Sequence, residues 1–214
     1  MIRDWLATFL GSHAYMSALL LAFFALPMPV FAECGCLWKG AFVDVQAHMP
    51  LIVSGRVVAE RGNYIDIQTQ RVLRGESYVN PIRIWLDRGD LCRAEVGSFP
   101  VGTDWVMALE RIESVPEGGF DPNTPNLSYG RVGDYSLSRC GGYWLKQGEN
   151  LVSGNLVGGP RWDRDPKMSP ILLDLVEAYV RGHIDVATLE EASKVDPELQ
   201  ELILNTRLFL RQGS

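Results

Sequence analysis

The four cysteines have the spacing that says most about chemistry in this chain. Cys34 and Cys36 are separated by a single glycine, whereas Cys92 and Cys140 each stand alone. Two cysteines one residue apart are in poor geometry to bond each other. We therefore expect each member of the close pair to bond one of the lone cysteines, and both such pairings remain open. Either pairing fixes the residues around Cys34 and Cys36 as a rigid, exposed edge, which is typical of a binding module.

No pattern of residues in the sequence points to catalysis in the same way. Beyond residue 32 the chain has two histidines, His48 and His183, and they lie far apart in the sequence. Neither has a metal-ligand spacing, and there is no nucleophile-elbow or phosphate-binding glycine motif. We expect a protein that is not an enzyme, with no cofactor and no intrinsic metal site. An enzyme of an unrecognised class that uses the acidic stretch with Glu117 and Asp121 is the alternative.

The first 32 residues are typical of a signal peptide. Residues 14–32 are almost entirely apolar, and Ala32 ends a tripeptide suited to signal peptidase. Pro27 and Pro29 interrupt the apolar helix just before that point. We expect cleavage after Ala32, no stable membrane insertion afterwards, and a secreted or periplasmic protein with paired cysteines. A retained membrane anchor is the alternative.

The charge of the chain excludes one class of partner. The formal net charge is −6, and the isoelectric point is near 5.1. An acidic chain without a basic stripe has no electrostatic footprint for a phosphate backbone. We expect a protein partner and no nucleic acid.

The region from residue 33 to 160 is expected to be one mainly β domain. Short apolar or alternating runs are separated by glycine turns, which predicts five or six strands in a small closed barrel or sandwich. Gly55 interrupts the first run and predicts a bulge or sharp bend. A long polar loop, 115–131, is either functional or mobile, with a solvated insertion as the plain alternative. The predicted strands are 51–58, 64–69, 81–86, 105–109, 135–140 and 151–157.

The region from residue 161 to 214 predicts a helical extension. Ser169 and Pro170 suit the start of a helix that ends at Gly182. A short helical turn is expected over 188–193, and Asp196-Pro197 begins a last helix. Apolar stripes on the first and last of these helices predict packing against the barrel.

The stretch from Cys34 to about residue 157 resembles the amino-terminal, netrin-like domain of the tissue inhibitors of metalloproteinases. That family opens its mature chain with Cys-x-Cys, as Cys34-Gly35-Cys36 does here. An aromatic residue, Phe42, and a strand of the family's form at 51–58 follow. A Lys/Arg-Gly turn then precedes an Ile-rich strand, here Arg74-Gly75 before 82–84. A lone cysteine after that strand, and another shortly before a Trp-Leu pair, complete the match.

The resemblance implies an OB-like five-stranded barrel with Cys34–Cys92 and Cys36–Cys140 bridges. In these inhibitors the amine and carbonyl of the first cysteine chelate the catalytic zinc of the target protease. The next residue enters the specificity pocket. Here Glu33 precedes Cys34 if cleavage follows Ala32, and Gly35 has no side chain to fill a pocket. The family's third disulfide and its cysteine-rich second domain have no counterpart.

These departures favour a binding module with a different partner, and an active metalloproteinase inhibitor remains the alternative. Determining the amino terminus of the mature chain separates the two, since chelation requires Cys34 to be the first residue. We name the expected binding surface, residues 33–38 beside 91–93, the cysteine edge. Trp38 is either its exposed aromatic anchor or a side chain that covers the end of the barrel. Its proposed contact residues are Glu33, Cys34, Gly35, Cys36, Trp38, Leu91 and Arg93.

Overall fold

The computed structural model describes residues 34–89, 91–158, 168–198, 201–202 and 205. The expected signal peptide, Glu33 of the cysteine edge and the expected domain boundary at 160 lie outside these residues. Among the residues described, no helix is long and apolar enough to cross a membrane.

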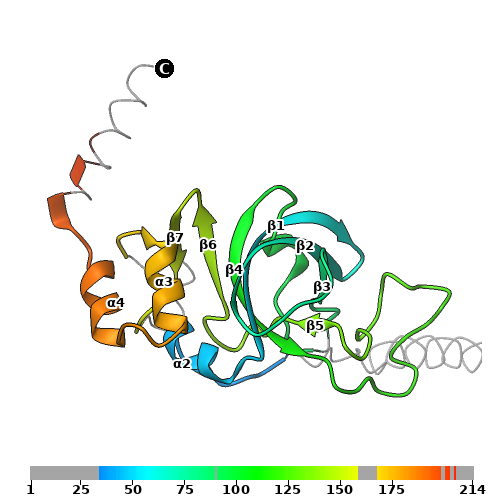
Figure 1. Cartoon of the computed structure of the whole chain (residues 1–214). Helices are drawn as coiled ribbons and strands as arrows, with labels where there is room; N and C mark the ends of the chain where they lie inside the picture. The colour runs from blue at the N-terminus through cyan, green and yellow to red at the C-terminus, as the bar shows by residue number, and fades with distance from the viewer. Residues whose placement is uncertain (1–33, 90, 159–167, 199–200, 203–204, 206–214) are drawn as a thin grey trace, which may run out of the picture. The chain divides into compact units, whose positions relative to one another are not determined.

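Five strands close into a barrel (Figure 1). They run in the order β1-β2-β3-β5-β4, and β4 pairs back to β1, which closes the circle. The β3–β5 pairing is parallel and the others are antiparallel. This order confirms the prediction of a small closed OB-like barrel. The strands are β1 (Leu51–Arg61), β2 (Tyr64–Arg74), β3 (Ile82–Trp85), β4 (Asp104–Arg111) and β5 (Tyr135–Ser136).

Strand β1 takes part in both β1–β2 and β1–β4 pairing, so it must bend sharply. Its register against β2 shifts at three places, one of them between Ser54 and Gly55. A Cβ atom at Gly55 would lie 2.5 Å from the carbonyl oxygen of Gln68. The glycine therefore allows the two backbones to approach at the bend, which confirms the prediction of a bulge at this residue.

Three further strands extend the sheet from β4: β6 (Trp144–Gly148), β7 (Leu151–Gly154) and β8 (Ile171–Leu172). The sequence did not predict β6, and the expected helix start at Ser169 and Pro170 is wrong. Instead Ile171 and Leu172 pair with β7, and the helix begins only at Leu173. The open edge of β7 provides backbone partners that an extended segment can satisfy before the helix begins.

The helices are short, and the described ones share the apolar core of the barrel. Val176, Val180 and Leu189 belong to the same buried cluster as the barrel strands. For Val176 and Val180 this is the packing predicted from the apolar stripe of the first C-terminal helix. The last helix includes Pro197, but most of its expected apolar stripe lies outside the described residues. The helical segments are α2 (Phe42–Val45), η1 (Gln46–His48), η2 (Val96–Ser98), α3 (Leu173–Val180) and α4 (Val186–Ser193).

A candidate binding surface beside the two disulfides

Two disulfides attach the first described residues to the barrel. Cys34 is bonded to Cys92 with Cα atoms 5.3 Å apart, and Cys36 is bonded to Cys140 with Cα atoms 5.7 Å apart. This is the pairing that the resemblance implies. The bridges join residues 58 and 104 positions apart in the sequence, so they hold an irregular segment that begins the described chain against two distant parts of the fold.

Hydrogen bonds reinforce this attachment from the segment around Cys140. Arg139 Nη2 donates to the carbonyl oxygen of Cys34 at 3.0 Å, and the Lys39 amide donates to the Cys140 carbonyl at 2.7 Å. Farther along, the Gly142 amide donates to the Gly40 carbonyl at 2.9 Å. Residues 34–40 are therefore held by backbone contacts as well as by the two bridges.

The side chains of this segment differ from the expected arrangement in one respect. Trp38, expected as the exposed aromatic anchor, is only half-exposed, whereas its neighbour Leu37 has 83% of its surface accessible. Gly35 is exposed, and a Cβ atom there would have open space around it. The sequence does not indicate Leu37 as the exposed residue, because nothing in the local pattern distinguishes which of two adjacent apolar residues faces outward.

The structure brings Leu91 and Arg93 to the same region, since Cys92 between them bonds Cys34. Leu91 and Arg93 are both half-exposed. Arg93 forms an isolated β-bridge with Ser138, and its Nη1 donates to the carbonyl oxygen of Tyr129 at 2.8 Å. The cysteine edge is therefore continuous with the 115–131 loop, a relation that the local sequence does not indicate.

The 115–131 loop, the long green excursion between β4 and β5 in Figure 1, is packed against the barrel at one point. Ser128 is fully buried and Asn63 is 3% exposed. The side-chain nitrogen Nδ2 of Asn63 donates to the backbone carbonyls of Ser128 and Leu86 at 2.8 and 3.1 Å. The side-chain oxygen Oδ1 of Asn63 accepts from the backbone amide of Ser128 at 2.9 Å. Near Ser128 the loop is fixed by a satisfied buried network, so this end of it is more than a solvated insertion, whereas residues 120–127 are exposed.

The β1–β2 turn makes that attachment possible. Gly62 adopts a φ of 58°, and a Cβ atom there would lie 1.9 Å from the carbonyl oxygen of Asn126. The backbone N–H of Asn63 donates to that carbonyl at 3.0 Å. The Arg61-Gly62-Asn63 sequence predicted the turn, but the role of Asn63 depends on a loop that begins some fifty residues later, so no local signal indicates it.

Cations lie over aromatic rings where the loop meets the cysteine edge. The guanidinium carbon of Arg88 is 4.4 Å from the centroid of the Tyr129 ring, and that of Arg131 is 5.0 Å from the Phe120 ring. Phe120 is 38% exposed, and both arginines are exposed. The carbonyl oxygen of Tyr129 also accepts a hydrogen bond from Arg93. These contacts therefore join the loop, the segment around Arg88 and Arg93, and the bridges into one surface.

The residues considered for catalysis are not brought together. His48 ends η1 and His183 follows α3, and both are exposed. Asp121 accepts a hydrogen bond from the Asn123 amide at 2.8 Å, as a loop-capping carboxylate does. The Sγ atoms of Cys34, Cys36 and Cys92 lie within 4.8 Å of one another. All three are disulfide-bonded, and thiolates are the form that binds metals.

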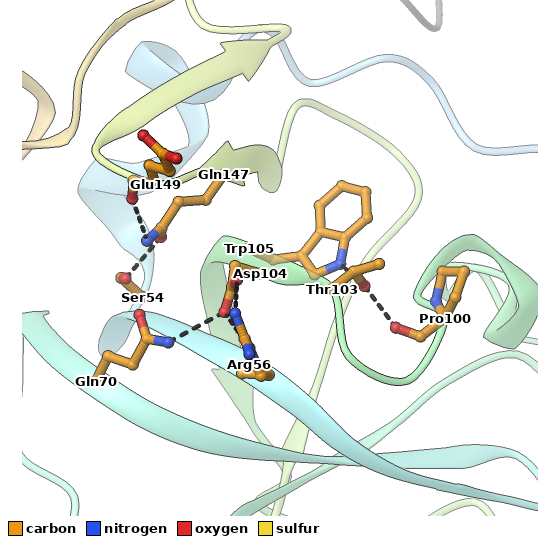
Figure 2. A network of polar contacts seen from close by, with 9 residues as sticks. All are labelled: Ser54, Arg56, Gln70, Pro100, Thr103, Asp104, Trp105, Gln147 and Glu149. Carbon is orange, nitrogen blue, oxygen red and sulfur yellow. Dashed lines mark hydrogen bonds and ion pairs between the residues drawn. The ribbon is translucent and has the colours of Figure 1, made fainter.

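A separate polar network joins β1, β2, β4 and β6, and Figure 2 shows it. Buried Ser54 donates to Gln147 Oε1 at 2.7 Å. Arg56 donates two hydrogen bonds to the Asp104 carboxylate, at 3.0 and 2.6 Å, and Gln70 donates a third at 3.0 Å. These bonds hold the pKa of the Asp104 carboxyl below its usual value, chiefly through Arg56. The network connects strands of the barrel and satisfies its own polar groups, which is a structural role.

No family model matches the chain, and no curated protein or solved structure is similar to it. The resemblance to the metalloproteinase inhibitors therefore stays a prediction from the motifs.

Proposed function

We propose that this protein is an exported, non-enzymatic binding module that recognises a protein partner through the cysteine edge. The observation that carries the proposal is the attachment of residues 34–38 by two disulfides with Leu37 left 83% exposed beside them. A rigid segment loses little conformational freedom on binding, so an exposed apolar side chain on it contributes more of its contact energy to affinity.

The disulfides also support the export that the proposal requires. Bridges of this kind persist in oxidising compartments such as the periplasm or the extracellular space. A signal peptide cleaved after Ala32 delivers the chain to such a compartment. The localisation proposed is therefore periplasmic or secreted, with no membrane insertion of the mature protein.

A second candidate is inhibition of a metalloproteinase. The bridges Cys34–Cys92 and Cys36–Cys140 are those that the resemblance implies for such an inhibitor. Chelation of a target's zinc would use the amine and carbonyl of Cys34, which requires the mature chain to begin at that residue. The carbonyl of Cys34 already accepts a hydrogen bond from Arg139, and Gly35 offers no side chain to a specificity pocket. We therefore rank the inhibitor below a module with another target.

The experiment is site-specific photo-crosslinking in the native compartment. A photoreactive residue is placed at Leu37 or Leu91 in the full chain, with Leu151, which is 43% exposed on β7, as the matched control. The proposal expects one protein to crosslink from positions 37 and 91 and not from position 151. Equal labelling from all three positions, or none from the edge, contradicts it.

Mass spectrometry of the purified mature chain separates the two candidates. Glu33 at the amino terminus fits the module with another target. Cys34 at the terminus, together with stoichiometric inhibition of a purified metalloproteinase catalytic domain, would instead establish the inhibitor.

A further inference from the structure

Several arginines lie around the cysteine edge, although the chain as a whole has a net charge of −6. Four arginines lie along the chain of contacts that joins the edge to the 115–131 loop. Arg139 contacts Cys34, and Arg93 and Arg88 both contact Tyr129. Arg131, two residues from Tyr129, lies over Phe120.

Three of these cations are not neutralised by ion pairs. The six ion pairs in the described part of the chain include neither Arg88, Arg131 nor Arg139. Arg88 and Arg131 are held instead by the faces of aromatic rings, which orient a guanidinium without cancelling its charge. Their hydrogen-bond donors therefore remain available to a ligand.

Three carboxylates close to these arginines in the sequence accept hydrogen bonds within the protein. Asp87 accepts from the Gly89 amide at 3.1 Å, and Asp134 accepts from the Trp85 indole nitrogen at 2.7 Å. Asp121 accepts from the Asn123 amide. These three acids serve local structure, and among the described residues no hydrogen bond or ion pair uses the guanidinium donors of Arg88 and Arg131.

Apolar side chains are interspersed with the arginines. Leu37 is 83% exposed on the cysteine edge, and Leu127 and Phe120 are 52% and 38% exposed on the loop. Val132, next to Arg131, is 66% exposed. Exposed apolar residues among cations are typical of surfaces that bind amphipathic, oppositely charged segments.

We propose that this surface binds an acidic segment of its protein partner in which carboxylates flank an apolar residue. The carboxylates would face Arg88, Arg131 and Arg139, because the planar guanidinium group matches a carboxylate bidentately. The apolar residue would contact Leu37 or Phe120. The inference rests on the proposed function, since it names the chemistry of that partner.

The test uses the full mature protein with its disulfides intact and a labelled acidic peptide as the probe. The probe is a fluorescent hexapeptide, Glu-Glu-Leu-Phe-Glu-Glu, and its matched control has glutamine in place of every glutamate. Binding is measured by fluorescence anisotropy at low salt and again at about 0.3 M salt, where exposed charges are strongly screened. We expect the acidic peptide to bind at least about tenfold more tightly than the glutamine peptide.

The decisive variant is Arg88→Glu with Arg131→Glu, since both side chains are exposed and neither donates a hydrogen bond to another described residue. The matched control, Lys146→Glu with Lys194→Glu, makes the same change in net charge on β6 and beyond α4. We expect the first variant to weaken peptide binding about tenfold or more and the control to leave it unchanged. Equal loss in both variants would mean a nonspecific charge effect and would overturn the inference.

Anionic vesicles distinguish a membrane surface from a protein segment. Binding to phosphatidylglycerol vesicles without binding to the acidic peptide overturns the inference. Crosslinking from position 37 that persists unchanged in the Arg88→Glu, Arg131→Glu variant also overturns it, while the proposed binding function stands. Absence of any partner at the cysteine edge overturns the proposed function itself.

Discussion

The cysteine edge and the 115–131 loop are both irregular segments held against the same barrel, but by different interactions. The edge is attached covalently through Cys92 and Cys140. The loop is attached by hydrogen bonds to the buried Asn63 side chain. A covalent attachment tolerates exposed, variable side chains nearby, because its strength does not depend on excluding water. A hydrogen-bonded attachment must bury its polar groups, so it constrains the residues around it.

The difference has a consequence for the surface that the two segments form together. Leu37 and Gly35 are exposed next to the bridges, whereas Ser128 and Gly130 are buried at the loop's attachment. Side chains on the cysteine edge can therefore be substituted with little effect on folding. The loop can do so only at its tip, around Phe120.

Removal of the disulfides should have the largest effect on stability. The bridges close loops of 58 and 104 residues, and in the chain-entropy model each contributes roughly 4 to 5 kcal/mol. We expect Cys34→Ser with Cys92→Ser, or Cys36→Ser with Cys140→Ser, to lower the free energy of unfolding by about that amount. Urea unfolding checks this, with reduction of the wild type by a dithiol as the companion measurement. An unchanged midpoint would show that the edge is not held by its bridges.

Substitution of Asn63 should have the next largest effect and should act on the loop. Asn63→Ala leaves the Ser128 amide and two carbonyls without their buried partner, which we expect to cost about 3 kcal/mol. The matched control is Asn123→Ala in the exposed part of the loop, expected to change stability by less than about 0.5 kcal/mol. Hydrogen exchange should show faster exchange of the loop amides in the first variant and unchanged protection near Cys92. Equal effects of the two variants would contradict the assigned role of Asn63.

Two glycine substitutions compare the regions directly. Gly62→Ala places a methyl group 1.9 Å from the Asn126 carbonyl at a positive φ of 58°, so we expect a loss of about 2 kcal/mol or more. Gly35→Ala meets open space and should change stability by less than about 0.5 kcal/mol. Thermal unfolding of both variants checks the prediction. A greater loss in Gly35→Ala than in Gly62→Ala would reverse the comparison.

Acidification should have the smallest effect, and it should act on the barrel and on neither attachment. Arg56 lowers the pKa of Asp104 in the folded state, so the carboxylate's contribution to stability is fully present above its unfolded pKa of about 3.9. That contribution is lost as the pH falls through the lower, folded pKa. We expect the difference in unfolding free energy between wild type and Asp104→Asn to shrink between about pH 5 and pH 2. The difference between wild type and Asn63→Ala should stay constant over that range, because no titrating group takes part in that network.

Local sequence predicted much of the barrel. Apolar and alternating runs predicted β1 to β4, and Gly55 indicated the bend, because these features depend on residues near one another in the chain. The same reasoning missed β6 and expected a helix where Ile171 and Leu172 form β8. Both strands exist because an edge of the sheet is available to pair with them, and that edge is created by distant residues.

The sequence by itself determined the chemistry of the cysteines, since a Cys-Gly-Cys pair must find partners elsewhere, and it determined the strand pattern of the barrel. Tertiary structure decided which side chains become the surface. Leu37 rather than Trp38 is the more exposed, and Asn63 is buried beneath a loop far along the chain. Four arginines from separate segments come to lie beside Cys34, Tyr129 and Phe120. Exposure and proximity depend on how the barrel closes, and closure is a property of all five strands together.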